Sequence, residues 1–357
     1  MELPNKKMDL LQLFTVPAFC VQNNTVIQIN QAAAQRGIVE NTPLSEMIPT
    51  ECDAYEHYTG GYLYITLNIN GIPCGVTVTR VEGIDVFLLE QEQPVLHTLA
   101  LASQQLREPL ANIMCAADDL FANDLLKADS RMQEQAAQIN QGLFRMLRLL
   151  GNMSDAGKYQ KRNLHQMKTC QIGAVFDEIL SRVQELAAQA NRTVSFTGLS
   201  QKVYCLADTE KLERGIYNLL SNAIKYSPVG SVISAKLTKN RNTLYFTVQD
   251  QGSGIAADLR GNMFSRYLRE PGIEDGRNGV GLGMLLIKAA AAAHDGTVLI
   301  EQPEEGGTRV TMTLAIKQNT SNTLRSNIRS VDYAGEQDHS LIELSDILPS
   351  SSFEKIN

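Results

Sequence analysis

The sequence predicts a multidomain protein in which an α+β domain, an α-helical hairpin and a layered α/β domain follow one another along 357 residues. Three changes in residue pattern indicate this order. Strand-like segments separated by turn residues extend to about residue 90, a helical periodicity begins at Pro94, and helical and strand-like segments alternate beyond residue 170. At about 100 to 200 residues per domain, the length agrees with two or three domains.

Composition and charge limit the class of protein. Hydrophobic residues make up 43% of the chain and charged residues 20%, which is the usage of a globular protein and excludes global disorder. The formal net charge is −7, from 32 basic and 39 acidic residues, so bulk charge favours neither nucleic acid nor an anionic membrane as a partner. The longest apolar run, AAAAA at 289–293, is far shorter than the roughly 18 residues of a membrane span.

The cysteines and the first residues indicate the compartment. Six cysteines are scattered along the chain without a C-x-x-C pair, and MELPNKKMDLLQLF contains no signal-peptide core. We therefore expect reduced thiols and a cytoplasmic protein.

Residues 1–92 are expected to form the α+β domain, with an antiparallel sheet. Strand signals occur in NTVIQIN at 24–30, YLYITLNI at 62–69, PCGVTVTRV at 73–81 and IDVFLLEQ at 84–91. Turn residues separate the last three segments, which predicts that they pair as neighbours.

Residues 93–158 are expected to form the helical hairpin. Apolar residues recur at spacings of three and four from Leu96 to Ile113, and a second stripe of the same kind extends from Met132 to Leu150. Such a thin pair of helices buries only part of its apolar surface. The pattern therefore predicts a homodimer in which two hairpins form a four-helix bundle.

Residues 159–317 are expected to form the layered α/β domain. Helices are predicted at IGAVFDEILSRVQELAAQAN and TEKLERGIYNLLSNAIKYS, and strands at TVSFTG, VISAKLTK, TLYFTVQD, TVLIEQ and RVTMTLAI. Residues 318–357 are rich in Ser, Asn and Asp, and we expect a weakly ordered tail there. A short docking helix at LIELSDIL is the alternative.

Two asparagines form the first candidate site. Asn218 and Asn222 in IYNLLSNAIKYSP lie four residues apart and so project from the same helix face. An amide carbonyl is an oxygen ligand that Mg²⁺ can use without an added charge. Surface amides or helix caps explain the pair less well, because apolar residues flank both positions.

Two glycine-containing segments are the other candidates. In VQDQGSGI at 248–255 a strand ends at Asp250, whose carboxylate can accept the exocyclic amine of adenine, while Gly252 and Gly254 let the backbone approach the ring. In NGVGLGMLLIKAAAAA at 278–293 a glycine loop leads into a helix whose N-terminus can bind phosphate. A D-x-G-x-G turn alone is common, and a dinucleotide fingerprint would need a strand before the glycine loop, where the sequence is polar.

In this order and spacing, the three segments resemble the N, G1 and G2 boxes of the ATP-binding domain of sensor histidine kinases, a two-layer α/β sandwich of the superfamily that includes gyrase. MFSRYLRE at 263–270 is similar to the phenylalanine box of that family, and HDGTVLIEQPEEGGTRVTMTL at 294–314 is similar to its closing strand pair. The resemblance implies that ATP and Mg²⁺ are cofactors.

The resemblance also assigns roles to single residues. Asn218 and Asn222 would hold the magnesium ion. Lys225 and Arg269 would face the phosphates, where the guanidinium can form a fork onto two oxygens, and Asp250 would bind adenine. The full set implied around ATP is Asn218, Asn222, Lys225, Tyr226, Asp250, Gly252, Gly254, Ile255, Arg269, Gly279, Gly281, Leu282, Gly283 and Thr308.

The hairpin resembles the dimerisation and phosphoacceptor domain of the same family. SQQLREPL at 103–110 aligns with the pattern Ser-His-Glu-Leu-Arg-Thr-Pro-Leu, but Gln104 replaces the acceptor histidine, Gln105 the neighbouring acid and Glu108 the threonine. An amide nitrogen whose lone pair is delocalised does not attack a γ-phosphate as imidazole does. No catalytic residue is therefore intact at these positions.

His97 is a weaker candidate acceptor, because it lies on the same helix face as Gln104 but about 10 Å along the axis. A solvated histidine at the helix start explains it better. In the first domain, VIQINQAAAQRGI at 26–38 and the three strands after it resemble a PAS sensory module.

The expected function is that of an ATP-binding, homodimeric signal-transduction protein of the sensor histidine kinase family that does not phosphorylate itself at the usual site. A response regulator or a partner histidine kinase would be its partner in a two-component phosphorelay. One alternative is an active kinase that uses His97 or phosphorylates a partner in trans. Another is a slow ATPase of the gyrase-like superfamily, against which Asn218 argues because gyrase-type relatives have a glutamate there and an amide cannot deprotonate water.

Overall fold

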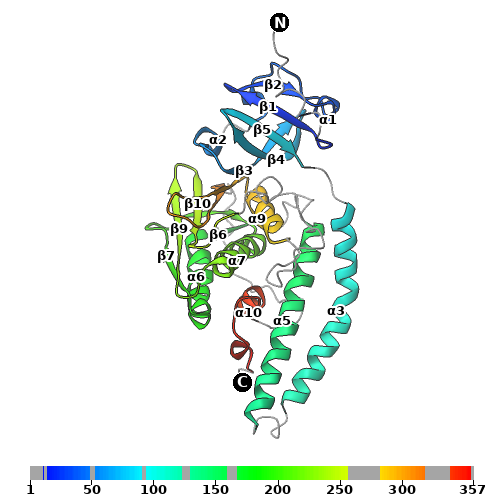
Figure 1. Ribbon diagram of the computed structural model, residues 1–357, viewed down its shortest axis with the longest axis vertical. Coiled ribbons are helices and arrows are strands. Elements are labelled where there is room, and N and C mark those ends of the chain that lie inside the picture. The colour runs from blue at the N-terminus through cyan, green and yellow to red at the C-terminus, as the bar shows by residue number, and fades with distance from the viewer. Residues whose placement is uncertain are drawn as a thin grey trace.

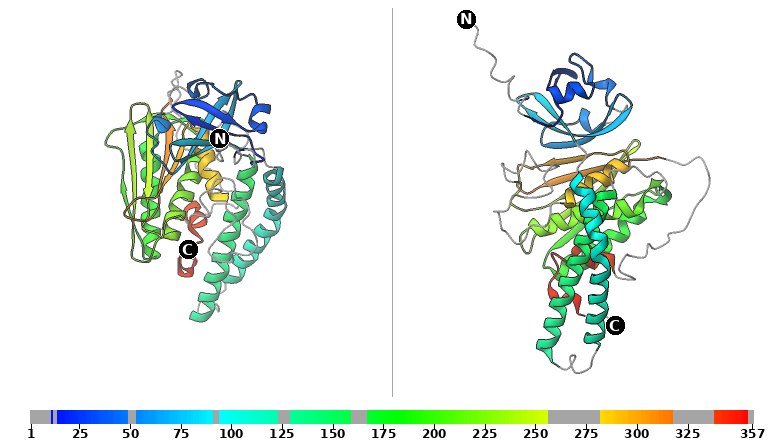
Figure 2. Two further views of the ribbon diagram at one scale, coloured as in Figure 1. Left: turned by 45° about the horizontal axis from the view of Figure 1, so that its top comes forward. Right: turned by 90° about the vertical axis from the view of Figure 1, so that its right-hand side faces the viewer.

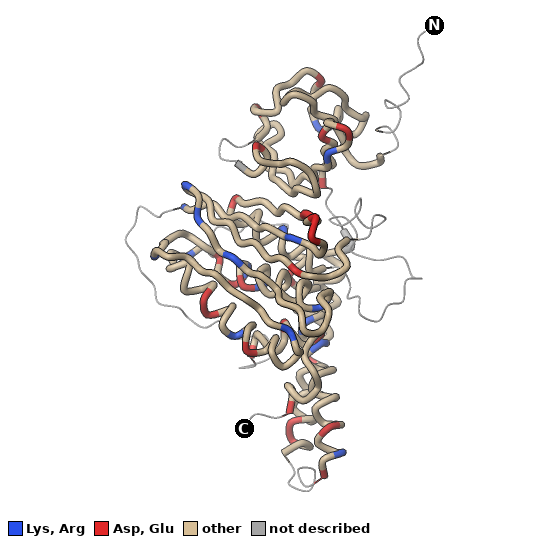
Figure 3. Tube along the Cα trace, turned by 60° about the vertical axis from the view of Figure 1, so that its left-hand side comes forward, with Lys and Arg blue, Asp and Glu red and all other residues tan. Residues whose placement is uncertain are grey.

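The computed structural model describes residue 11 and residues 14–48, 53–90, 94–122, 129–158, 167–255, 282–317 and 338–354. Three folded parts follow one another, and the C-terminal segment lies beside the second and third of them (Figure 1). Among the described residues, no helix combines the length and the apolar character needed to cross a membrane. Figure 3 shows basic and acidic positions interspersed over the three parts.

The N-terminal part is an antiparallel sheet with short helices. Its strands lie in the order β2-β1-β5-β4-β3, and Phe19 stacks on Phe87 in its core with ring centroids 4.7 Å apart. Asn30 caps the first helix, since its side chain accepts a hydrogen bond from Ala33 N at 2.9 Å. The elements are β1 Ala18–Gln22, β2 Thr25–Ile29, α1 Gln31–Gln35, η2 Leu44–Glu46, α2 Asp53–Glu56, β3 Tyr62–Ile69, β4 Ile72–Val81 and β5 Ile84–Leu89.

The second part consists of two long helices that lie side by side, α3 Pro94–Phe121 and α5 Ser130–Lys158 (Figure 1). Leu110 and Leu143 are buried in the core that the helices share. Other residues of the predicted stripes remain about half exposed: Leu106 51%, Ile113 52%, Ile139 50% and Met146 48%. The pair therefore leaves part of its apolar surface uncovered within one chain.

The third part is a sheet covered on one face by helices, the two-layer arrangement (Figure 2). Alternate residues of β9 are buried, because only one side of this strand faces the helices. Phe176 of α6 contacts Phe246 of β10 in the core, with centroids 4.9 Å apart. The elements are β6 Lys168–Gln171, α6 Ile172–Gln189, β7 Thr193–Thr197, β8 Tyr204–Ala207, α7 Thr209–Tyr226, β9 Val232–Asn240, β10 Thr243–Gln249, α9 Leu282–Ala293, β11 Val298–Glu301 and β12 Arg309–Ala315.

The first and third parts share one sheet. β3 pairs antiparallel with β11, so that Tyr64 lies opposite Val298 and Tyr62 opposite Ile300. The result is a ten-stranded sheet in the order β2-β1-β5-β4-β3-β11-β12-β10-β9-β7. Each strand covers an edge of the other sheet that would otherwise present unpaired backbone groups.

The C-terminal segment differs from the expectation of a weakly ordered tail. Within 318–357, residues 338–354 form α10 His339–Leu344 and η4 Ser350–Phe353, beside α5 (Figure 1). Ile342, Leu344 and Phe353 are at most 4% exposed, because the helical hairpin and the third part supply the apolar partners that the tail lacks by itself. The expected weakly ordered tail was wrong for these residues, where the alternative of a short helix at LIELSDIL describes α10 better; residues 318–337 and 355–357 lie outside the described part.

Candidate nucleotide-binding site

Helix α7 positions the two asparagines. Asp208 caps its first turn by accepting a hydrogen bond from Lys211 N at 3.2 Å, and the helix ends at Tyr226, two residues before Pro228. Asn218 is 1% exposed and donates through Nδ2 to Arg214 O at 2.8 Å, while Asn222 is half-buried. The donated hydrogen bond fixes the amide plane of Asn218.

The start of α9 lies directly against Asn218. A Cβ atom added at Gly283 would lie 2.8 Å from Asn218 Oδ1, so the absence of a side chain there lets the amide carbonyl face α9. Leu282, the preceding residue, is 2% exposed and packs with Leu96 and Ala156 of the hairpin. The site and the hairpin are therefore in direct contact.

Asp250 follows β10 and is held by the turn before β12. Its Oδ1 accepts hydrogen bonds from Gly252 N at 2.8 Å and Thr308 N at 3.0 Å, and its own N–H donates to Thr308 O at 2.9 Å. Burial raises the pKa of the Asp250 carboxyl, and these backbone donors oppose that rise. The carboxyl group is thus fixed through one oxygen.

The glycines bring three distant segments together. A Cβ atom at Gly252 would lie 2.6 Å from Tyr226 O, the last residue of α7. Gly307 has a φ of +77° and faces the backbone of Asp250 so closely that a side chain would overlap it. Tyr226, Asp250 and Thr308 are therefore neighbours although the first and the last lie 82 residues apart in sequence.

Residues 207–318 match the family described as histidine kinase-, DNA gyrase B-, and HSP90-like ATPases. This span includes every residue of the candidate site from Asn218 to Thr308. The chain therefore contains a domain of this ATPase family, and it is similar to sensor histidine kinases. The resemblance to sensor histidine kinases that the three segments predicted is confirmed.

Among its relatives, sensor protein KdpD of Clostridium acetobutylicum is 29% identical over 222 residues, which are 61% of this chain and 24% of KdpD. SenX3 of Mycolicibacterium smegmatis, a sensor-like histidine kinase, is 30% identical over 226 residues, 62% of this chain and 56% of SenX3. The chain thus spans between about a quarter and just over half the length of these two kinases.

The full-length structure of ShkA in complex with AMPPNP has a TM-score of 0.50 to this chain at 18% identity, covering 63% of this chain and 46% of ShkA. At this identity the likeness concerns the fold alone.

In this chain, the predicted glycine loop is described only from Leu282 onward. Arg269, Gly279 and Gly281, together with the segment 263–270, lie outside the described residues, so their roles stay predictions. Lys225 and Ile255 are half-buried beside the described part of the site, and Tyr226 is 51% exposed. Lys225 Nζ lies 5.9 Å from the centre of the Tyr226 ring.

The acceptor region of the hairpin lies on α3. Gln104, Gln105 and Glu108 are exposed, whereas Ser103 is buried and donates through Oγ to Ala100 O at 2.7 Å. Position 104 is thus accessible but carries an amide. His97 is exposed on the same helix.

One ion pair with a buried lysine was missed by the sequence analysis. Lys288 of α9 is 1% exposed, its Nζ is bonded to Glu90 Oε1 at the end of β5, and it lies 4.7 Å from the centre of the Tyr64 ring. Burial lowers the pKa of Lys288 to about 7. The signal in the sequence was a single lysine inside the apolar helix LLIKAAAAA.

Proposed function

We propose that this chain binds ATP with Mg²⁺, transmits a signal within a two-component system, and does not phosphorylate itself at the usual position. One observation carries the proposal: an exposed Gln104 stands on α3 where the resembling pattern has its acceptor histidine, in a chain whose asparagine, aspartate and glycine segments converge. The nucleotide site is retained and the nucleophile is not.

The described residues fit a magnesium nucleotide. The Asn218 carbonyl is held in place by its own amide hydrogen bond, and Gly283 leaves the space beside it free of a side chain. Asn218 and Asn222 would hold the ion, and Asp250 would accept the adenine amine. Lys225 and Arg269 would bind the phosphates, and the ion would supply charge neutralisation there.

The same proposal includes a homodimer. The exposed apolar residues of α3 and α5 need a cover, and a second hairpin offers the same surface in return. A response regulator or a second histidine kinase would be the signalling partner.

The test compares the chain with a variant that restores the chemistry, Gln104→His with Gln105→Glu. Each protein is incubated with labelled ATP and Mg²⁺, and nucleotide binding is measured in parallel by calorimetry. We expect binding by both proteins, no acid-labile label on the natural chain, and label on the restored variant. Acid-labile label on the natural chain would contradict the proposed loss of self-phosphorylation. Absence of nucleotide binding would contradict the proposed binding of ATP.

A second candidate is phosphorylation of His97, which the exposure of this side chain on α3 favours. Its distance from position 104, about 10 Å along the helix at 1.5 Å per residue, counts against it, because transfer in line tolerates little misplacement. If the natural chain is labelled, His97→Ala decides: loss of the label assigns it to His97. A steady ATP turnover typical of a dedicated ATPase would instead favour the gyrase-like alternative.

A further inference from the structure

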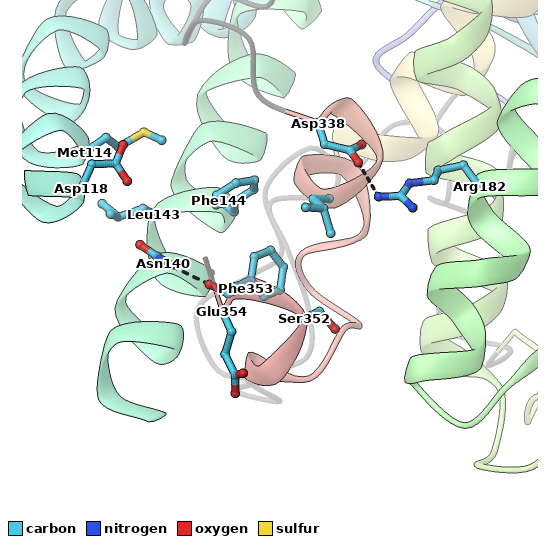
Figure 4. Close-up of a pocket in the computed structure, with 11 residues that line it drawn as sticks. Met114, Asp118, Asn140, Leu143, Phe144, Arg182, Asp338, Ser352, Phe353 and Glu354 are labelled. Atoms are coloured by element: carbon cyan, nitrogen blue, oxygen red, sulfur yellow. Dashed lines mark hydrogen bonds and ion pairs between the residues drawn. The ribbon is translucent and has the colours of Figure 1, made fainter. Parts of the chain in front are cut away.

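The C-terminal segment 338–354 lies outside the matched family span of 207–318, yet it contacts two of the three folded parts. α10 and η4 lie between α5 of the hairpin and α6 and α7 of the third folded part, residues 167–317, which we call the ATPase domain below (Figures 1 and 4). We call the surface formed by α5, α6 and α7 the docking groove. Its contacts with the segment combine buried apolar side chains with ion pairs and hydrogen bonds.

A buried cluster of charges joins the segment to both sides of the groove. Glu343 is 1% exposed and is bonded to Arg214 of α7, which also donates to Asp155 of α5 at 2.9 Å. Arg148 of α5 bonds Asp346 at 2.7 Å and donates to Ser221 of α7 at 3.0 Å. One carboxylate of the segment thus closes a network between hairpin and ATPase domain.

The docking groove also contacts both the backbone and the side chains of the segment. Arg182 of α6 bonds Asp338 at 2.6 Å, and Gln141 donates to Leu348 O at 2.7 Å. Phe144 of α5 meets Phe353 with ring centroids 5.2 Å apart. The segment therefore offers the groove both acidic and apolar side chains.

The segment does not fill the docking groove, and two side-chain atoms at the contact lack a hydrogen bond among the described residues. A partly open pocket of about 450 Å³ lies among α3, α5, α6 and the segment, lined in part by Met114, Leu143 and Phe353 (Figure 4). Arg148 Nε and Glu343 Oε2 are 3.6 Å apart, and neither has a hydrogen-bond partner among the described residues. Contacts of this kind hold a segment more weakly than a filled core does.

We propose that the docking groove is a site for an acidic amphipathic segment, and that residues 338–354 of this chain occupy it as a releasable strap. The strap holds the ATPase domain against the hairpin. Arg214, which binds the strap, lies one helical turn from Asn218 and accepts the hydrogen bond of its amide. Docking of the strap therefore fixes the helix of the candidate nucleotide site relative to the hairpin, whose helix α3 carries Gln104.

The test is hydrogen exchange of the full chain, followed by mass spectrometry, for the natural protein and Glu343→Gln. This change removes the negative charge that faces the buried guanidinium groups of Arg148 and Arg214, which destabilises the docked state. Glu354→Gln is the control, because Glu354 is an exposed acid of the same segment. We expect exchange in 339–348 to rise by about tenfold or more, with a rise at Leu96, Ala156 and Leu282, where hairpin and ATPase domain touch.

Hydrogen exchange in the sheet core distinguishes release of the strap from unfolding of the ATPase domain. Exchange in β9 and β10 should not change in Glu343→Gln. An equal rise there would mean that the segment is part of the ATPase core, and an unchanged exchange at Leu96, Ala156 and Leu282 would mean that it holds nothing; either result overturns the proposal. If Glu343→Gln does not fold, Asp346→Asn, whose side chain is one-third exposed, gives the same comparison with a milder loss.

Discussion

At the scale of single residues, the distance between Gly283 and Asn218 decides what the candidate site tolerates. An alanine at 283 would place Cβ 2.8 Å from Asn218 Oδ1, so the amide would have to turn away. Gly283 is the second residue of α9, where alanine is itself a good helix former, so the helix should still form in the variant. We predict that Gly283→Ala folds but binds Mg²⁺–ATP about tenfold more weakly or worse, measured by calorimetry.

Gly142→Ala is the matched control for this prediction. Gly142 lies in α5 and nothing lies within 4 Å of the position that its Cβ would take. This variant should keep the full nucleotide affinity. Unchanged affinity in Gly283→Ala as well would show that Asn218 takes no part in binding.

His294 allows a prediction about pH. Its Nε2 accepts a hydrogen bond from Asp208 N at 3.0 Å, and its Nδ1 lies 2.7 Å from Ala290 O, an arrangement of the neutral ring at the start of α7. Burial lowers the pKa of His294 below its ordinary 6.5, so the unfolded chain binds a proton first on acidification. The stability from this group is present above pH 6.5 and is lost as the pH falls below it.

Thermal unfolding between pH 5 and pH 8 checks this sign against His294→Gln, which does not titrate. The natural chain should lose more stability than the variant below pH 6.5, by about 1.4 kcal/mol for each unit by which folding lowers the pKa. Parallel curves for the two proteins would contradict the prediction.

At the scale of elements, the register of β6 and β8 places Cys170 directly opposite Cys205. Ile172 N donates to Val203 O at 3.0 Å. Because backbone hydrogen-bonded pairs recur at every second residue of an antiparallel ladder, Cys170 and Cys205 are also such a pair, with Cα atoms about 5.5 Å apart. Disulfides span that distance, and a hydrogen bond from Cys205 lowers the pKa of Cys170.

Mild oxidation with diamide should therefore join Cys170 and Cys205, with a mass loss of about 2 Da located by peptide mapping. Two thiols are oxidised and the diazene accepts both hydrogens, which balances the step. Cys115, which is exposed on α3, serves as the control and should not be joined to either of them. Failure of the pair to form under these conditions would mean that the register is different.

At the scale of the whole molecule, the uncovered apolar surface of the hairpin predicts the assembly. Ile113 and Ile139 are 52% and 50% exposed, and a charge at each would have to be buried in a dimer. We predict a dimer mass for the natural chain in light scattering after gel filtration, and a monomer for Ile113→Glu with Ile139→Glu. Gln138→Glu, an exposed polar position of α5, should leave the dimer intact.

Prediction from the sequence succeeded where the determinants lie close together in the chain. The asparagine pair is set by a four-residue helical spacing, and the Asp250 turn by two glycines within four residues. The docked tail appeared only as the alternative at LIELSDIL because its composition suggests solvent, whereas Arg148 and Arg214, some 130 to 200 residues away, stabilise Glu343 in a buried position.

The sequence by itself determined the chemistry of this protein: an amide at position 104, an oxygen-rich helix face at 218 and 222, and glycines where a side chain would not fit. Only the tertiary structure decided how the parts are joined, through the β3–β11 pairing, the Lys288–Glu90 ion pair and the segment 338–354 in its groove. The physical reason is that residue type and local spacing fix bonding capacity and backbone conformation, whereas burial and charge pairing depend on partners that the chain brings together only when it folds.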